Sequence, residues 1–437
     1  MASHEPVPGL RKIPENLPAL LRPPGAASGE EARERLANLV VIVGIVALAL
    51  AVMGWWSHGQ VRQSLRDLRA AGLSALLEAE SGALTIWIDE KKRSAERWAA
   101  DEPVQRSAAA LVKLAQGGMD AAAVCRSPAR HALLDQIRPF VALEEAVAVN
   151  LVARDGAIIA ALHDDYCGLT VAKGDFERRL APVFSGRTVF VRPFTEAERV
   201  GPGHRVPFDR PLVWVETPVR GDSGEVIAAL GFGRLAEDRF GTLLLLSSTQ
   251  SSREAYAFDA HGMMLTQSRY LGDLRLAGRL GPGETGILRI PVRDPGADIV
   301  AGFRPSTPDS DWPLTKLADT AIAAKAAGGP FEGVILEPYR DYRGASVIGA
   351  WRWLREKEMV IAVEIEAGEA YAPLKYLEIA FGTLLGFFAA AMLAAISSSL
   401  WAVRLKQREA RRVGPYTLER EIGEGGMSLF VRFSAMH

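Results

Sequence analysis

The sequence lacks most signatures of enzymes and of nucleic-acid-binding proteins. Its seven histidines show no His-Glu-x-x-His motif or other paired ligand spacing, and no Gly-x-Ser-x-Gly nucleophile elbow is present. We therefore predict no metal site and no catalytic residue, and we interpret His163 as part of a turn. The formal net charge of -1 and the absence of a basic tail argue against a nucleic-acid partner. Only two cysteines occur, Cys125 and Cys167.

Charged residues are also missing from two long stretches. No Asp, Glu, Lys or Arg occurs between Arg35 and Arg62 or from Ile379 to Val403. At about 1.5 Å per residue, the most apolar part of the first stretch, residues 36–56, reaches about 30 Å, which is one hydrocarbon thickness. We predict two transmembrane helices, 36–56 and 379–403, with tryptophans at their ends. A cleaved signal peptide is the alternative for the first stretch.

Basic residues indicate the orientation of both helices. The juxtamembrane segment 404–413 is rich in Lys and Arg, whereas acidic residues precede the second helix. The positive-inside rule then places the C-terminus, and with two spans also the N-terminus, in the cytoplasm. Residues 1–35 are proline-rich and are expected to form a disordered cytoplasmic leader. We therefore expect a two-pass protein of the inner (cytoplasmic) membrane.

The segment between the helices is long enough for two small domains. We assign 57–250 to a long helix with a membrane-distal lobe and 251–375 to a membrane-proximal lobe. Each lobe begins with a predicted hairpin, at 146–162 and 255–268, and ends with another. The closing hairpins combine 212–219 with 226–232 and 345–354 with 359–365. The same order of hairpin, insert and hairpin therefore occurs twice.

Helical composition precedes the first lobe, from Val61 to about Leu114. Within it, apolar and small residues recur at alternating spacings of four and three: Val61, Leu65, Leu68, Gly72, Ala75 and Ala79. This stripe is either a face packed on the domain or a seam between two copies of the chain, and both readings stay open. A second helix, near 239–252, is expected to link the lobes.

This order resembles the double Cache sensor architecture. The most similar patch runs from Asp341 to Trp353 and continues through 363–366 and 369–374. The resemblance implies an α+β membrane protein in which two transmembrane helices flank a periplasmic double Cache region, with two PAS-like antiparallel sheets and a long N-terminal helix. It also implies a homodimer and an extracytoplasmic small-molecule ligand of unknown identity.

Ligand-binding candidates are sought in the membrane-distal lobe, because double Cache sensors usually bind their ligand there. We nominate Arg192, Trp214 and Glu216, together with Asp164, Asp165 and Tyr166 from a nearby loop. Arginine presents a planar fork to a carboxylate, and tryptophan can cover an apolar or cationic group. The alternative is that Trp214 is a core residue and that Arg192 and Glu216 form a surface pair. The pattern of amino-acid-binding Cache domains is not evident.

The two cysteines fall on the expected extracytoplasmic side, where disulfides persist. A Cys125–Cys167 bridge and two separate thiols are both compatible with the sequence, because it does not report the distance between them.

The last segment, 414–437, resembles the opening strand and glycine-rich loop of bacterial Ser/Thr protein kinases. The similar run is Gly-Pro-Tyr-Thr-Leu-Glu-Arg-Glu-Ile-Gly-Glu-Gly-Gly-Met, and its expected nucleotide-binding residues are Ile422, Gly423, Gly425 and Gly426. From Ser428 onward the run departs from the family pattern, so we interpret the segment as the incomplete start of a kinase domain.

The sequence contains none of the catalytic motifs of a protein kinase. No strand lysine, His-Arg-Asp loop or Asp-Phe-Gly follows, so we expect no catalysis and no cofactor in this chain, whereas an intact relative would use ATP and Mg. Three functions remain open: the sensor of a truncated Ser/Thr kinase receptor, a stand-alone sensor that modulates intact kinases, and a true kinase with a frameshifted record.

Overall fold

The computed structural model describes residues 27–195, 208–245, 251–410, 412–413, 416–425 and 428–435. The fold is mixed α+β. Residues 64–372 form one compact unit, and the residues before and after them form a second unit.

Helices precede the first sheet of the larger unit. They are α1 (Ala27–Ala99), α2 (Glu102–Gln116), α3 (Ala121–Cys125) and α4 (Pro128–Leu143). The helix expected from Val61 to Leu114 is therefore interrupted between α1 and α2. Pro103 lies in the first turn of α2, where its missing amide costs no hydrogen bond, whereas a continuous helix would need that amide.

The first sheet contains five antiparallel strands in the order β2-β1-β5-β4-β3. The strands are β1 (Ala148–Ala153), β2 (Ile158–Ala161), β3 (Val189–Phe194), β4 (Leu212–Arg220) and β5 (Val226–Leu235). Short helical turns connect β2 to β3: η2 (Asp164–Tyr166), α5 (Lys173–Asp175), η3 (Phe176–Leu180) and α6 (Ala181–Phe184). We call residues 102–245 the first lobe. The hairpins predicted at 146–162 and 212–232 are both present.

The second sheet contains four antiparallel strands in the order β6-β9-β8-β7. They are β6 (Glu254–Phe258), β7 (Glu332–Arg340), β8 (Ser346–Leu354) and β9 (Met359–Glu366). The helices and turns of this region are α9 (Leu271–Leu276), η5 (Asp309–Asp311), α10 (Lys316–Ala326), η6 (Arg355–Lys357) and α11 (Ala367–Ala370). We call residues 251–370 the second lobe. The predicted hairpin of β8 with β9 is present.

Strand order supports the predicted repeat. Strands β6, β9, β8 and β7 occupy the same order in the second sheet as β1, β5, β4 and β3 in the first. The hairpin expected at 255–268 is reduced to β6 and an isolated bridge between Phe258 and Met264, so that prediction was wrong for its second strand. The hydroxyl of Thr266 accepts the amide of Ala257 at 2.9 Å, which replaces a strand–strand hydrogen bond.

The helix expected to link the lobes is short. Only α8 (Arg239–Thr242) and η4 (Leu243–Leu245) are helical, and residues 246–250 lie outside the described part. Ser252 is not helical, contrary to our expectation. Its amide donates to Glu369 at 2.7 Å, and its hydroxyl accepts the amide of Glu366 at 3.0 Å, so it is held against the end of β9.

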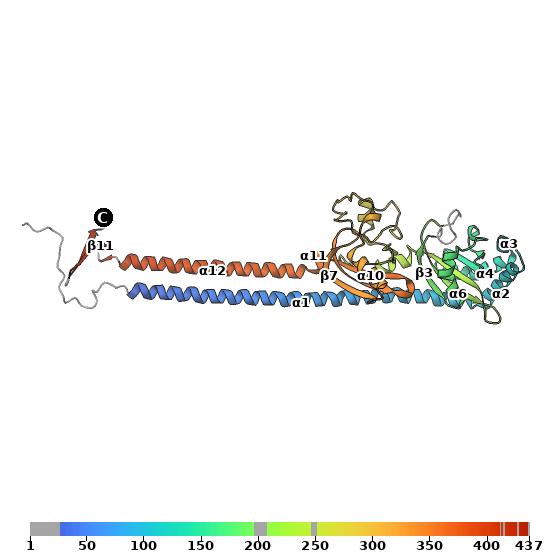
Figure 1. The fold of residues 1–437 in the computed structure, drawn as a ribbon, viewed down its shortest axis with the longest axis horizontal. Helices are drawn as coiled ribbons and strands as arrows, with labels where there is room; N and C mark the ends of the chain where they lie inside the picture. The colour runs from blue at the N-terminus through green and yellow to red at the C-terminus, as the bar shows by residue number, and fades with distance from the viewer. Residues whose placement is uncertain are drawn as a thin grey trace, which may run out of the picture. The chain divides into compact units, whose positions relative to one another are not determined.

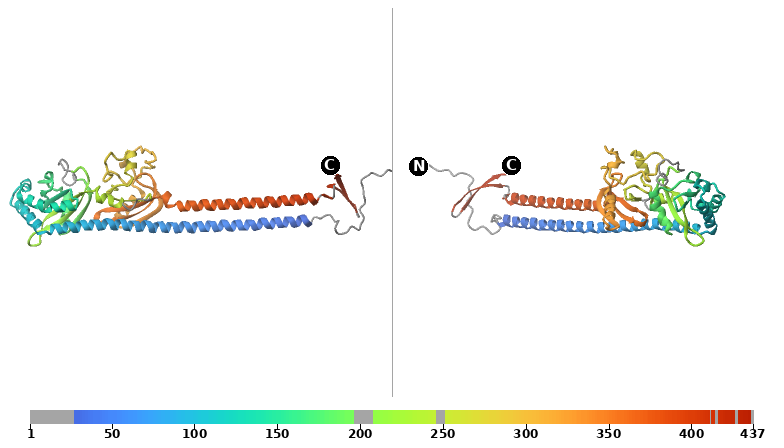
Figure 2. Two further views of the ribbon diagram at one scale, coloured as in Figure 1. Left: turned by 180° about the vertical axis from the view of Figure 1, so that it is seen from behind. Right: turned by 45° about the vertical axis from the view of Figure 1, so that its right-hand side comes forward.

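Helix α1 packs against both sheets of the larger unit (Figures 1 and 2). Its buried apolar residues recur at helical spacing, and they are Leu73, Leu77, Leu84, Ile88, Ala95 and Ala99. All belong to one apolar core with residues of both sheets, including Phe232 of β5 and Ile361 of β9. One face of each sheet is therefore turned toward α1, and that of the first sheet also packs against α2 and α4.

The stripe predicted from Val61 to Ala79 is not that packed face. Val61 and Leu68 are 39% and 66% exposed, and Gly72, Ala75 and Ala79 are exposed as well. The reading of the stripe as a face packed on the domain was wrong, because the helix turns Leu73 and Leu77 inward instead. The seam between two copies stays a prediction.

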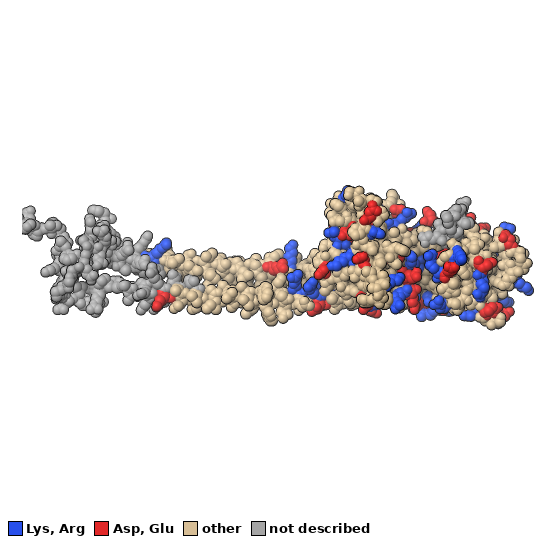
Figure 3. Space-filling view, viewed as in Figure 1, with Lys and Arg blue, Asp and Glu red and all other residues tan. Residues whose placement is uncertain are grey.

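The smaller unit contains the first part of α1, the helix α12 (Ala372–Ala410) and the strands β10 (Arg412–Val413), β11 (Tyr416–Gly425) and β12 (Ser428–Ala435). Two helical stretches, Val41–Ala99 and Ala372–Ala402, contain windows long and apolar enough to cross a membrane. The parts of these stretches that contain no Asp, Glu, Lys or Arg, residues 41–61 and 379–402, form the uncharged surface in Figure 3. Residues 428–435 pair antiparallel with β11, although their sequence departs from the kinase pattern.

Candidate ligand-binding site

Side chains of the first sheet alternate between two different environments. Val149, Leu151, Val213 and Val215 belong to the core that includes α1. Their neighbours Ala148 and Trp214 lie on the opposite face, in a separate apolar cluster with Val191 and Phe194. The connection between β2 and β3 contributes Tyr166, Leu180 and Val183 to a further cluster on this opposite face, beside Val152 and Ala229. We call the face of a sheet that lies opposite the α1 core the covered face of that sheet.

A polar row crosses the covered face between its two apolar clusters. Asn150 of β1 pairs with Gly231 of β5, which pairs with Glu216 of β4. Asn150 and Glu216 are both 0% exposed. Burial of an amide and a carboxylate on one sheet face is costly unless both find polar partners.

The two polar side chains converge over Gly231. A Cβ atom at this position would lie 2.4 Å from Oε2 of Glu216 and 2.5 Å from Oδ1 of Asn150. In the next row, a Cβ atom at Gly233 would lie 2.8 Å from the Trp214 indole. The two glycines therefore leave the space that the carboxylate, the amide and the indole occupy.

The amide of Asn150 is the clearest sign of a binding site. Among the residues that the structure describes, neither its Nδ2 nor its Oδ1 has a hydrogen-bond partner. A fully buried amide without partners is rare in native proteins and calls for a group that is able to bond it.

An ion pair from the β2–β3 connection lies on the same side. Nε of Arg179 lies 2.6 Å from Oδ1 of Asp175, and the two side chains are only 14% and 3% exposed. The guanidinium of Arg179 stacks on the ring of Phe194 at 3.6 Å, and Phe194 packs in the cluster that contains Trp214. The covered face thus combines carboxylates, an amide, a guanidinium and aromatic rings.

Three of the six nominated ligand-binding residues lie on the covered face. Trp214 and Glu216 lie on adjacent pleats of β4, and Tyr166 is fully buried among the residues packed on the same face. The expected surface pairing of Arg192 with Glu216 is not found, since Glu216 is buried. Arg192 instead lies 3.2 Å from Asp259, in the turn that follows β6, and so connects the two lobes.

Asp164 and Asp165 lie away from these residues. Both are exposed, and the Asp164 carboxylate accepts a hydrogen bond from Arg130. Arg130 also donates to the carbonyl oxygen of Ala161 at 2.8 Å. The two acidic residues therefore belong to a surface turn, in which Arg130 holds α4 against the end of β2.

The remaining nominated residues lie elsewhere. Cys125 and Cys167 are joined by a disulfide, with a Cα–Cα distance of 5.7 Å. Ile422, Gly423 and Gly425 lie in β11, and Gly426 falls outside the described residues. Within the described ranges, no group of three His, Cys, Asp or Glu residues is placed to hold a metal ion.

Asn150, Gly231, Asp175 and Arg179 were not nominated from the sequence. A lone asparagine in the apolar run Ala-Val-Asn-Leu-Val-Ala and two glycines in β5 were signals that could have been used. The other two residues gave no such signal, because the connection that carries them has no regular period.

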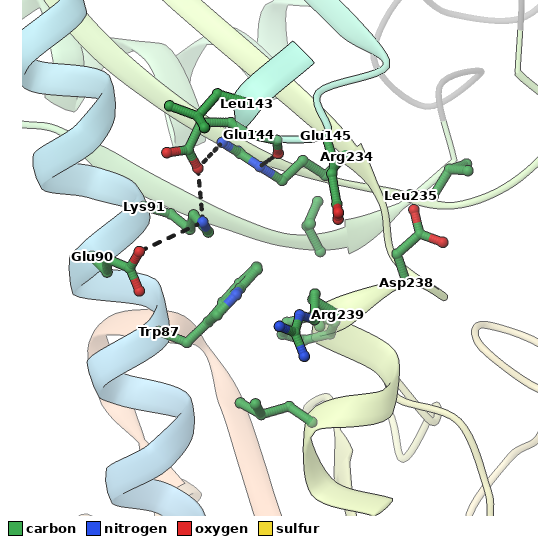
Figure 4. A pocket seen from close by; sticks show the side chains of 13 residues that line it. Trp87, Glu90, Lys91, Leu143, Glu144, Glu145, Arg234, Leu235, Asp238 and Arg239 are labelled. Atoms are coloured by element: carbon green, nitrogen blue, oxygen red, sulfur yellow. Dashed lines mark hydrogen bonds and ion pairs between the residues drawn. The ribbon is translucent and has the colours of Figure 1, made fainter. Parts of the chain in front are cut away.

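A separate pocket of about 370 Å³ lies on the opposite side of the sheet, between α1, the end of α4 and the end of β5 (Figure 4). Trp87 and Phe240 contribute aromatic walls, and their rings are 6.0 Å apart. Glu144 lies at its edge and is 10% exposed. It accepts from Lys91 at 2.7 Å and from Ser94 at 2.9 Å, and it lies 3.3 Å from Arg234.

Glu144 therefore joins three elements of the first lobe: α1, α4 and β5. Burial acts to raise its pKa, but the hydrogen bonds from Lys91 and Ser94 and the positive charges of Lys91 and Arg234 more than offset this, and the pKa lies below its ordinary value. A lowered carboxyl pKa stabilises the fold above the ordinary pKa, and this contribution is lost as the pH falls through the lowered value. Glu144 thus faces two of the pocket's three cations, Lys91 and Arg234.

We predict that Glu144→Gln lowers the free energy of unfolding by about 2 kcal/mol at neutral pH, because two cations lose their carboxylate. Thermal unfolding of the full chain in lipid nanodiscs, followed by tryptophan fluorescence, measures the change. The difference from wild type should shrink at acidic pH. Glu90→Gln is the control, since Glu90 is 60% exposed and lies 3.8 Å from Lys91. An equal effect of both substitutions would contradict the assignment.

Comparison with known proteins gives distant structural likenesses. No protein-family model matches the chain, and no curated protein matches it. The sensor domain of the V. cholerae histidine kinase DctB is 14% identical, with a TM-score of 0.41 over 70% of this chain and 98% of that one.

Two ligand-binding domains of chemoreceptors also resemble this chain distantly in structure. That of Campylobacter jejuni Tlp3, in complex with L-norvaline, is 11% identical, with a TM-score of 0.39 over 70% of this chain and 94% of that one. That of Pseudomonas aeruginosa PctB, in complex with L-Arg, is 14% identical, with a TM-score of 0.37 over 74% and 98%. Likenesses at this level say nothing about the ligand of this chain.

Proposed function

We propose that this chain is a two-pass membrane receptor whose double Cache region lies outside the cytoplasm and binds a small molecule in the first, membrane-distal lobe. Two sheets with the same strand order follow a long helix, and two apolar helical stretches flank them. The disulfide between Cys125 and Cys167 fits an oxidising, extracytoplasmic location.

The proposed ligand carries a protonated amine. The observation that supports this most strongly is the convergence of Glu216 and Asn150 over Gly231. An ammonium group has three donors and no acceptor, so it would be able to donate to the unpaired Asn150 oxygen and to the Glu216 carboxylate together. Trp214 on the neighbouring row supplies a ring face suited to the apolar or cationic part of such a ligand.

Binding in this site would act on the receptor by population shift. The site joins β1, β4 and β5 to the connection that covers them. A ligand that binds one arrangement of that connection more tightly than another would favour that arrangement. The exposed stripe of α1 from Val61 to Ala79 is the proposed contact with a second copy of the chain.

We predict that a compound with a primary amine raises the melting temperature of the full chain in nanodiscs in a saturable manner. The probes are small primary amines, free amino acids and dicarboxylates of matched size. Gly231→Ala should weaken binding of the active compound about tenfold or more, because its Cβ atom would displace both converging side chains.

The matched control for this experiment is Gly272→Ala, where an added Cβ atom meets nothing within 4 Å. Glu216→Gln provides a second test, since it removes the charge and keeps the shape. Stabilisation by dicarboxylates alone, or unchanged amine affinity in Gly231→Ala, would show that the assigned ligand class is wrong.

A Ser/Thr protein kinase is the proposed output domain. Strand β11 carries Gly423 and Gly425 at its end, and β12 returns antiparallel to it. These two antiparallel strands, with glycines at the end of the first, support the resemblance of residues 414–437 to the start of a kinase domain.

We expect the DNA beyond the codon for His437, read in all three frames, to encode a strand with a lysine and, further on, an Asp-Phe-Gly motif. Sequencing of the locus tests this directly. If all frames lack both, the kinase output is excluded, and the chain is better described as a stand-alone sensor that modulates other kinases.

A further inference from the structure

The second lobe also carries a polar row on its covered face, but here two carboxylates lie side by side. Glu254 of β6 pairs in register with Glu364 of β9, which pairs with Gly349 of β8. Glu254 and Glu364 are each 2% exposed. The strands that carry this row, β6, β9 and β8, correspond by strand order to β1, β5 and β4, which carry Asn150, Gly231 and Glu216 in the first lobe.

Groups of the protein itself fill this second row. Glu254 accepts the Tyr342 hydroxyl at 2.8 Å and the Ser268 hydroxyl at 2.9 Å. Glu364 accepts the Tyr339 hydroxyl at 2.7 Å through Oε1. A Cβ atom at Gly349 would lie 2.5 Å from the Tyr339 hydroxyl, so this glycine makes room for that group.

The second oxygen of Glu364 is different. Its Oε2 makes no well-formed hydrogen bond with any residue in the described ranges. The Tyr256 hydroxyl lies two residues beyond Glu254 on the same face of β6. It is the polar group of β6 that lowers the pKa of Glu364. Because Oε1 already accepts from Tyr339, Oε2 is the oxygen that is available to carry a proton.

Positive charge is scarce around this pair. A third carboxylate, Asp341, is 1% exposed and binds Arg343 at 2.8 Å. The same guanidinium stacks on Tyr270 at 3.5 Å and lies 3.7 Å from Glu366. The titratable and charged groups that face the pair are Tyr256 on β6, Tyr270 in the following loop, Tyr339 on β7, and Asp341, Tyr342 and Arg343 in the turn before β8. One arginine cannot neutralise three buried carboxylates.

The pKa of Glu364 follows from this arrangement. Burial raises its pKa to about 8, and the negative charges of Asp341 and Glu254 contribute, against the opposing hydrogen bonds of Tyr339 and Tyr256. Burial also raises the pKa of Glu254, although the charge of Arg343 opposes this. The raised pKa and the side-by-side placement of two buried carboxylates both favour the protonated form of Glu364 in the folded protein.

The position of Glu364 connects it to the exit of the chain. Strand β9 ends at Glu366 and continues directly into α11 and then α12. Around this junction, Arg69 of α1 donates to the carbonyl oxygen of Ala370 at 3.0 Å, and the Tyr371 hydroxyl donates to Leu336 of β7 at 2.6 Å. A change at the end of β9 therefore acts on the residues that begin the exit helix.

We propose that the second lobe is a proton-operated switch. Glu364, which lies beside Glu254, carries a proton and releases it at mildly alkaline pH. The loss of this proton loosens the junction of β9 with α11. The proton is taken from and returned to water, so no other reactant is required. This switch is independent of any ligand in the first lobe.

The sign of the pH effect is fixed by the raised pKa. Between the ordinary glutamate pKa and the raised value, the unfolded chain is ionised at Glu364 while the folded chain keeps its proton. Folding therefore takes up a proton. The contribution of Glu364 to the free energy of unfolding is complete below the ordinary glutamate pKa. It is lost as the pH rises through the raised value.

We predict that the melting temperature of the full chain in nanodiscs falls from mildly acidic to alkaline pH, and that Glu364→Gln removes most of this fall. The proton uptake on folding near neutral pH should decrease by about one per chain in the variant. Hydrogen exchange of the β6, β9 and α11 amides should accelerate at alkaline pH in wild type and stay constant in Glu364→Gln. Glu356→Gln is the control, because that side chain is 89% exposed.

A measurement on the wild-type chain covers the case in which the variant does not fold. Infrared difference spectroscopy should show the carbonyl band of a protonated carboxyl group that disappears at mildly alkaline pH, and Tyr339→Phe should shift its frequency. Absence of the band at neutral pH, or a pH dependence that is the same in Glu364→Gln and wild type, would overturn the proposal.

Discussion

The apolar stripe of α1 is the constraint on which the rest of the larger unit depends. Its residues between Leu73 and Ala99 belong to one core with inward-facing residues of both sheets. Because strand side chains alternate, each sheet that buries one face against this core turns its other face toward its own connections. Those connections are long and irregular, and they create the covered faces where the polar residues lie.

The two covered faces treat their polar rows in opposite ways. In the first lobe, Gly231 separates Asn150 from Glu216, and the asparagine amide has no partner among the described residues. In the second lobe, tyrosine and serine hydroxyls bind Glu254 and Glu364, which form the polar row of the corresponding strands. One repeated architecture thus provides the row that we propose for an external amine and the row in which we propose that a proton is held.

Much of this fold could be predicted from the sequence, because hairpins and charge-free helices depend on local patterns. The β1–β2, β4–β5 and β8–β9 hairpins were predicted. The predicted packed face of α1 was incorrect, because Leu73 and Leu77 are buried in place of Gly72 and Ala75. Trp214 and Glu216 were nominated, but the convergence of Asn150 and Glu216 depends on register across β5. Likewise, the pairing of Glu254 with Glu364 joins residues that lie 110 positions apart (364 minus 254). Local sequence does not contain such information.

The most direct test of the central claim is a high-resolution structure of the full chain in nanodiscs with a stabilising primary amine. The account predicts density for the ammonium group above Gly231, within hydrogen-bonding distance of both Glu216 and Asn150, and no added molecule between Glu254 and Glu364. A direct hydrogen bond between the Asn150 amide and Glu216, with the amine bound elsewhere, would contradict it.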